Sequence, residues 1–245
     1  SDELLIEASE LAKENSTNLT FHMSPNYTDV ENYLEKVGVR PITHLQDLGV
    51  LGEHLLIAHA VHLDDYELET LLTTNSAVVS CPWAYLRLGQ GVTNFGRHPE
   101  FFIRGGRLSL GCDAGNAGDN VDLLSSAKLF AGLMQESEFE SSTPSSNCAL
   151  ESITILGAEA IGLSEEIGSI EVGKRADVVL VDTKHQAWQP QSPDPVIQLI
   201  WGAGTSGIHS VIASGKLVVE NGNCLTVDES EIFSDLHKRQ KRLLG

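Results

Sequence analysis

The chain has 245 residues, of which 41% are hydrophobic, and this composition is ordinary for a globular protein that buries a core. Its formal net charge is −18, from 34 acidic and 16 basic residues. Such a charge repels phosphate backbones and anionic lipid headgroups, so we expect no nucleic-acid partner and no membrane partner. No apolar run in the sequence approaches the roughly 20 residues needed to span a bilayer.

Four cysteines, Cys81, Cys112, Cys148 and Cys224, lie far apart and form no Cys-x-x-Cys pair. This pattern favours reduced thiols over a disulfide framework, and we expect a cytoplasmic protein. The sequence starts with residues 1–3 (SDE), without an initiator Met and without a basic segment. We therefore expect a cut or processed start and no signal peptide.

The first two thirds of the chain alternate between strand-like and helical segments. Short apolar runs, the pattern of buried strands, occur at residues 19–21, 55–58, 77–80 and 108–111. Apolar residues at helical spacing predict helices over residues 4–12, 30–37, 41–48, 64–72, 99–104 and 123–134. Strands that alternate with helices predict a parallel sheet with right-handed crossovers.

The last third has a different character. Residues 135–148 are rich in Glu, Ser and Pro and are expected to form a surface loop, followed by one helix over residues 148–161. After Gly162, strands are expected at residues 169–172, 176–181, 209–213 and 216–219, with a closing helix after Asp228. These short strands and their turns predict a small β unit.

Three of the expected parallel strands are followed by a residue that can ionise, namely His22, His59 and Asp113. In parallel α/β folds the chemistry lies beyond the carboxyl ends of the strands, so these side chains are candidates for a shared site. Imidazole and carboxylate groups are ligands of zinc and related divalent ions. A His after a strand is also often an ordinary structural residue, and on spacing alone both interpretations stay open.

Four segments resemble the deaminase and chlorohydrolase branch of the amidohydrolase superfamily. Residues 56–63 (LIAHAVHL) resemble the sixth barrel strand of that branch, and residues 81–91 (CPWAYLRLGQG) resemble its next conserved segment. Residues 110–113 (LGCD) resemble its strand-eight Gly-Thr-Asp, and residues 167–177 (IGSIEVGKRAD) resemble the entry into its β-sandwich. The order and spacing of the four segments agree across nearly the whole chain.

The resemblance implies an α/β fold made of a partial (β/α)8 TIM-type barrel, about strands five to eight, and part of a small β-sandwich domain. A complete barrel takes roughly 250 residues. We therefore expect residues 1–165 to form a partial barrel, residues 166–228 the sandwich part and residues 229–245 a C-terminal helix. The first half of the barrel is expected to be missing, so that the chain is a fragment.

The resemblance also implies roles for matching positions. His22 corresponds to a metal ligand, and His59 to the His that orients the attacking water or polarises the substrate. Asp113 corresponds to a metal-bound carboxylate that also accepts the proton of the water. One divalent ion is implied, zinc first, with iron or manganese as alternatives. His62 is expected to be structural or part of the pocket wall, and Trp83, Arg87 and Asn116 to line the pocket or simply pack.

Two departures from the family pattern matter. No His-x-His pair precedes His22, so the metal site is expected to be incomplete in this chain. The family's strand-five His-x-x-Glu reads His22-Met23-Ser24-Pro25 here, and proline cannot transfer a proton. Asp29 or Glu31, from the following helix, is left as a candidate for that role.

The implied function is hydrolysis of a C–N bond of a small cyclic substrate by a metal-activated water, in the manner of a deaminase, amidase or chlorohydrolase. The alternative is a non-catalytic fragment or binding subunit that keeps the fold. A half barrel exposes two sheet edges, which favours a homo-oligomer or pairing with the missing N-terminal half.

Overall fold

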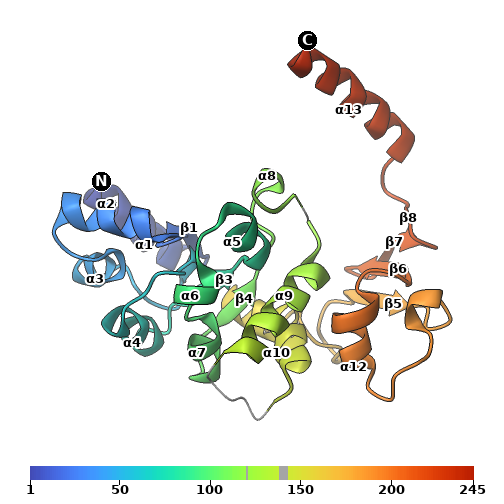
Figure 1. The fold of residues 1–245 in the computed structure, drawn as a ribbon, viewed down its shortest axis with the longest axis horizontal. Helices are drawn as coiled ribbons and strands as arrows, with labels where there is room; N and C mark the ends of the chain where they lie inside the picture. Colours follow the sequence, from blue (N-terminus) through green and yellow to red (C-terminus); the bar gives the residue numbers. More distant parts are fainter. Residues whose placement is uncertain (120, 138–142) are drawn as a thin grey trace.

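The computed structural model describes residues 1–119, 121–137 and 143–245, and it contains two separate sheets (Figure 1). The first sheet has four parallel strands in the order β1-β2-β3-β4. They are β1 (Leu19–Met23), β2 (Leu55–His59), β3 (Ala77–Ser80) and β4 (Leu108–Leu110). The four parallel strands predicted from the apolar runs are confirmed, as is the mixed α/β class.

Helices precede, connect and follow these strands, as the alternation of the sequence predicts. They are α1 (Asp2–Glu14), α2 (Tyr27–Val37), α3 (Pro41–Asp47), α4 (Asp65–Thr73), α5 (Pro82–Leu88), α6 (Val92–Phe95), α7 (His98–Ile103), α8 (Gly115–Gly118), α9 (Leu123–Glu136), α10 (Ser145–Ser152) and α11 (Ile155–Ala160). Helix α4 begins with a capping box, in which Asp64 and Glu67 each accept a backbone N–H of the other. The expected surface loop is shorter than residues 135–148, and its residues 138–142 lie outside the described part.

The main core lies between the parallel sheet and the helices that pack against it. Ile57, Leu68, Phe101 and Phe130 are buried there, from a strand and three helices. Ile200, far away in the sequence, is fully buried in the same core. The last third of the chain therefore contributes to the main core beside the parallel sheet. The expected domain boundaries at residues 165 and 228 stay predictions.

The second sheet is antiparallel, in the order β5-β6-β7-β8. Its strands are β5 (Val178–Val181), β6 (Ile208–Ala213), β7 (Lys216–Glu220) and β8 (Asn223–Cys224). A 3-10 turn η1 (Gln186–Trp188), helix α12 (Pro195–Ile197) and a π-helical turn η2 (Gln198–Ala203) lie between β5 and β6, and α13 (Glu229–Leu244) extends away from the other elements (Figure 1). No helix among the described residues is both long enough and apolar enough to cross a membrane.

Two sequence-based expectations are wrong in detail. Residues 169–172 form an irregular segment that runs into a turn at Val172, and they do not form a strand. Gly168 and Gly173, on either side, adopt left-handed φ angles of 94° and 104°, which a strand does not contain. The single helix expected over residues 148–161 is broken into α10 and α11 at Thr154, whose hydroxyl bonds back to the carbonyl of Leu150 at 2.7 Å.

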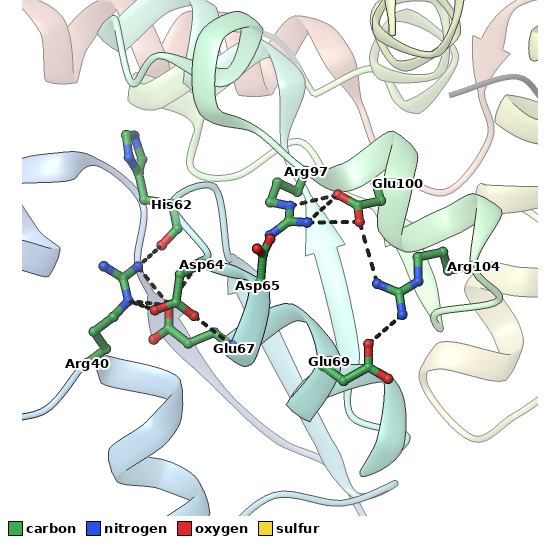
Figure 2. A network of polar contacts seen from close by, with 9 residues as sticks. All are labelled: Arg40, His62, Asp64, Asp65, Glu67, Glu69, Arg97, Glu100 and Arg104. Carbon is green, nitrogen blue, oxygen red and sulfur yellow. Dashed lines mark hydrogen bonds and ion pairs between the residues drawn. The ribbon is translucent and has the colours of Figure 1, made fainter. Parts of the chain in front are cut away.

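A network of ion pairs fixes the loop that follows β2 (Figure 2). The guanidinium of Arg40 contacts Asp64 at 2.9 Å and Glu67 at 2.7 Å, and it donates to the carbonyl of His62 at 2.9 Å. Glu67 is fully buried, and it also accepts the backbone N–H of Ile42 at 3.0 Å. Burial raises the pKa of Glu67, and the Arg40 guanidinium opposes that shift. Arg40 is therefore the cation that compensates a carboxylate held out of water.

Substitution Arg40→Met is expected to lower the free energy of unfolding by about 3 kcal/mol, because it leaves Glu67 buried without a cation. Urea denaturation at pH 8 measures this loss. Arg239→Met is the matched control, since the Arg239–Asp235 pair on α13 is exposed and is expected to contribute less than about 1 kcal/mol. Equal effects of the two substitutions would contradict a supporting role for Arg40.

Candidate active site

The parallel sheet brings the three predicted site residues together at its carboxyl edge. In the register of β1 and β2, His22 lies opposite Ala58 and Met23 opposite His59. The rings of His22 and His59 meet edge to face, with their centroids 4.8 Å apart. Nε2 of His59 lies 3.9 Å from Oδ2 of Asp113, which follows β4. The three side chains therefore form one cluster, although 91 positions (22 to 113) separate the first from the last in sequence.

The backbone at this edge is bent into the left-handed region at four non-glycine residues. The φ angles are 51° at Ser24, 80° at His59, 49° at Ala60 and 60° at Asp113. Such residues cost about 1–3 kcal/mol each and persist only where the surroundings fix them. The loops after β1 and β2 fix each other, because Ala60 N–H donates to the carbonyl of Met23 at 2.9 Å and the next two N–H groups donate to the carbonyl of Ser24.

Gly111 lets the chain after β4 approach β3 closely. Its N–H donates to the carbonyl of Ser80 at 2.8 Å. A Cβ at this position would lie 2.9 Å from Cγ1 of Val79 and 3.1 Å from Sγ of Cys81. A side chain at position 111 would therefore push away the segment that carries Asp113.

Burial decides the charge state of the His59 imidazole. His59 is 4% exposed, and burial lowers its pKa, while the Asp113 carboxylate acts in the opposite direction. His59 is therefore neutral at pH 7. Its Nδ1 atom is buried without a hydrogen-bond partner among the described residues. Burial also raises the pKa of the neighbouring Cys81 thiol to about 12, so Cys81 is not a thiolate at neutral pH.

Two concavities share Asp29 in their lining, and the first of them includes His22 of the cluster. The first, of about 450 Å³, is lined by His22, Pro25, Asp29 and others. The second, of about 550 Å³, is lined by Asp29 with the aromatic rings of Tyr27, His62 and Phe95 among others. Asp29 also acts electrostatically on His59. Of the two acidic residues that the sequence offers in place of the missing Glu, only Asp29 lines the space next to His22.

The other candidates for the pocket wall have structural contacts. His62 is buried, contacts the carbonyl of Gln90 through Nε2 at 3.1 Å and lies against Phe95. Trp83 donates to the hydroxyl of Ser125 at 2.8 Å. Arg87 forms an ion pair with Asp119, and Asn116 is exposed on α8.

His22 and Asp113 supply two of the donors that a divalent ion needs. Within residues 1–119, 121–137 and 143–245, no group of three or more His, Cys, Asp or Glu side chains is arranged to hold a metal. Zinc sites use three or four protein ligands, and an imidazole with a carboxylate is a fitting part of such a set. The donors fit a divalent ion in kind, and the described residues provide only part of the set.

Two buried residues next to His59 escaped the sequence analysis. Nε2 of His98 lies 2.6 Å from the carbonyl of His59, and its ring stacks on Tyr85 with centroids 5.5 Å apart. The Tyr85 hydroxyl accepts the N–H of Cys81 at 2.7 Å. Tyr85 lies within the segment 81–91 that resembles the family, but nothing in that segment marks it as a residue of the site. No sequence signal marks His98, because a polar side chain at the start of a short helix is normally solvated.

Comparison with known proteins gives a consistent result. A family model described as "Amidohydrolase family" matches residues 1–218. The chain is 30% identical over 243 residues to a 5'-deoxyadenosine deaminase from Methanobrevibacter smithii, a match that covers 99% of this chain and 55% of that protein. The chain thus spans about half the length of the curated relatives it matches.

Two solved structures share the fold. An adenosine deaminase from Xanthomonas campestris with bound zinc superposes with a TM-score of 0.92 at 25% identity, over 99% of this chain and 54% of that one. A mutant atrazine chlorohydrolase from Arthrobacter aurescens TC1, complexed with zinc and atraton, superposes with a TM-score of 0.84 at 21% identity. That match covers 96% of this chain and 51% of the chlorohydrolase.

Stability is expected to fall in mild acid because of His98. Burial lowers the pKa of His98 to about 4, whereas an unfolded His titrates near 6.5. From about pH 6.5 down to about pH 4, the unfolded chain therefore binds a proton that the folded chain does not. This difference lowers the free energy of unfolding by about 3 kcal/mol over that range. Urea denaturation at several pH values, for the wild type and for His98→Gln, isolates the effect, and parallel pH curves for the two proteins would contradict it.

Proposed function

The chain belongs to the amidohydrolase family, and we propose that it is the C-terminal part of a hydrolase that cleaves a C–N bond of a small cyclic molecule. The observation that carries the proposal is the convergence of His22, His59 and Asp113 at the carboxyl edge of the parallel sheet. Deaminases among the relatives support C–N hydrolysis as the reaction class. One of them is the 5'-deoxyadenosine deaminase described above, and another, 32% identical over 233 residues, is a 5-methylthioadenosine/S-adenosylhomocysteine deaminase from Thermodesulfovibrio yellowstonii. These names make 5'-deoxyadenosine and 5-methylthioadenosine the first compounds to test.

In this proposal the four parallel strands are the second half of an eight-stranded barrel, and β5–β8 are part of a β-sandwich. Strands β1 and β4 are the outer strands of the parallel sheet. Sheet edges favour pairing with further strands. An N-terminal half, covalently joined or separate, would complete the sheet and add the missing metal ligands.

His22 and Asp113 are proposed to hold one divalent ion, zinc first, together with ligands from that half. When bound, such an ion lowers the pKa of its water to about 7. Oδ2 of Asp113 accepts the proton of the attacking water, and its other oxygen is held by the N–H of Ala114 at 2.6 Å. His59, neutral and 3.9 Å from Asp113, orients the water or polarises the substrate through Nε2.

Asp29 is proposed to take the place of the missing strand-five Glu. Pro25 offers no group that carries a proton, whereas Asp29 lines the concavity beside His22. Its carboxylate is held by Nδ2 of Asn26 at 3.0 Å, which fixes it at the start of α2. From there it would take up the proton that Asp113 accepts from the water and pass it to the substrate nitrogen that leaves, so that both carboxylates end the step ionised.

Asp113→Asn is expected to reduce turnover by at least about 10²-fold, because an amide cannot accept the proton, and to lower the zinc content. Ammonia release from 5'-deoxyadenosine and metal analysis measure both effects in the enzyme that carries both halves of the barrel. Asp235→Asn is the matched control, since Asp235 is exposed on α13 and pairs with Arg239 of the same helix. An Asp113→Asn enzyme with full activity would refute the assigned role. Absence of both metal and turnover in the wild type would instead favour the non-catalytic binding subunit.

Asp29→Asn is expected to lower kcat by about 10²-fold while KM and zinc content stay near wild-type values. The asparagine keeps the size of the side chain but cannot transfer a proton. Glu31→Gln, two residues further along α2, is the control and is expected to retain kcat, because Glu31 lines neither concavity beside the cluster. If both variants keep the wild-type kcat, the proton comes from another group.

A further inference from the structure

The carbonyl group of His59 is the acceptor of a buried hydrogen bond that nothing in the proposed chemistry uses. Nε2 of His98 lies 2.6 Å from this oxygen, and the hydroxyl of Tyr85 lies 3.4 Å from it. The carbonyl belongs to the residue whose φ is 80°, and the next residue, Ala60, has a φ of 49°. A strained backbone needs contacts that hold it, and this carbonyl lies within the strained turn.

The tautomer of His98 follows from its surroundings. A carbonyl oxygen only accepts hydrogen bonds, so Nε2 of His98 must carry the proton and donate it. His98 is 2% exposed, and the low pKa that burial imposes keeps the ring neutral. Nδ1 is then an acceptor, and it is buried without a partner among the described residues. A buried unpaired acceptor costs stability. The position of the ring therefore satisfies Nε2 and leaves Nδ1 without a hydrogen bond among the described residues.

Helix α7 begins at His98, and ion pairs hold this helix in place. Arg97, directly before His98, makes a bidentate ion pair with Glu100 and a second ion pair with Asp65 at 2.7 Å (Figure 2). Arg104, at the end of α7, pairs with Glu69 of α4 (Figure 2). These pairs tie α7 to α4, the helix that follows the loop after β2. The ring of His98 stacks on Tyr85, with 12° between the planes.

We propose that His98 is a positioning residue for His59. Its Nε2–H holds the His59 carbonyl in the left-handed turn, and this fixes the direction in which the His59 side chain leaves the backbone, toward Oδ2 of Asp113. The proposal rests on the proposed function for its effect on rate, while its effect on geometry concerns the chain alone. His98 does not line the concavity beside His22, and its contact with the cluster is the bond to the His59 carbonyl.

Two substitutions distinguish the effect of the N–H donor from the effect of the shape of the ring. His98→Phe keeps a flat ring against Tyr85 and removes the N–H, whereas His98→Gln offers an amide N–H in place of Nε2–H. In the enzyme that carries both halves, His98→Phe is expected to lower kcat about tenfold to 100-fold with KM within about twofold of wild type. His98→Gln is expected to restore kcat to within a few-fold of wild type.

A crystal structure of each variant of the 245-residue chain supplies a readout that needs no activity. We expect the His59 ring to move away from Asp113 in His98→Phe and to stay in His98→Gln. Phe101→Leu on the same helix is the control for a merely structural effect, and it is expected to lower stability without moving His59. The proposal is overturned if His59 keeps its position and kcat in His98→Phe, or if the Gln variant behaves like the Phe variant. If the wild type shows no turnover, the proposed function fails and the crystal structures still decide the role of His98.

Discussion

The left-handed turn at His59 and Ala60 is the constraint on which the site depends. His59 lies in this turn, and its Nε2 is 3.9 Å from Oδ2 of Asp113. The turn is held from three directions: by the carbonyl of Met23, by Nε2 of His98 and, two residues later, by Arg40 at the carbonyl of His62. The position of the turn therefore depends on contacts from three other parts of the chain, at Met23, Arg40 and His98.

Arginine partners let this acidic chain bury carboxylates close to the turn. Despite a net charge of −18, the buried carboxylate of Glu67 is matched by Arg40, and Glu100 is matched by Arg97. Both arginines lie around the loop that follows β2 (Figure 2). Because a buried ion pair contributes little net stability and is costly to break, its value here is in fixing one geometry. The imidazoles deeper in the site stay neutral and need no counter-charge.

The sequence was informative where one local pattern decides the structure. Apolar runs that end in a polar residue predicted all four parallel strands and the three residues now found in one cluster. It failed where distant contacts decide. Residues 169–172 alternate like a strand but have no neighbouring strand in the described part of the chain, and Ile200 lies in a core that its own neighbourhood does not suggest. His98 could not be found, because its function depends on a carbonyl 39 residues away.

Among the described residues, both the parallel sheet and the set of candidate metal ligands are incomplete. The parallel sheet ends at β1 and β4 with no further strand, and the cluster at its carboxyl edge offers an imidazole and a carboxylate where a metal needs at least one more ligand. The open edges and the two donor side chains belong to the same parallel sheet. Strands added beyond its edges would place their own carboxyl ends beside His22 and Asp113, because parallel strands share one direction. A single complementary half can thus close the sheet and complete the ligand set at once. For that reason assembly and metal binding are expected to be coupled: whatever stabilises the strand contacts also brings the missing donors to the metal.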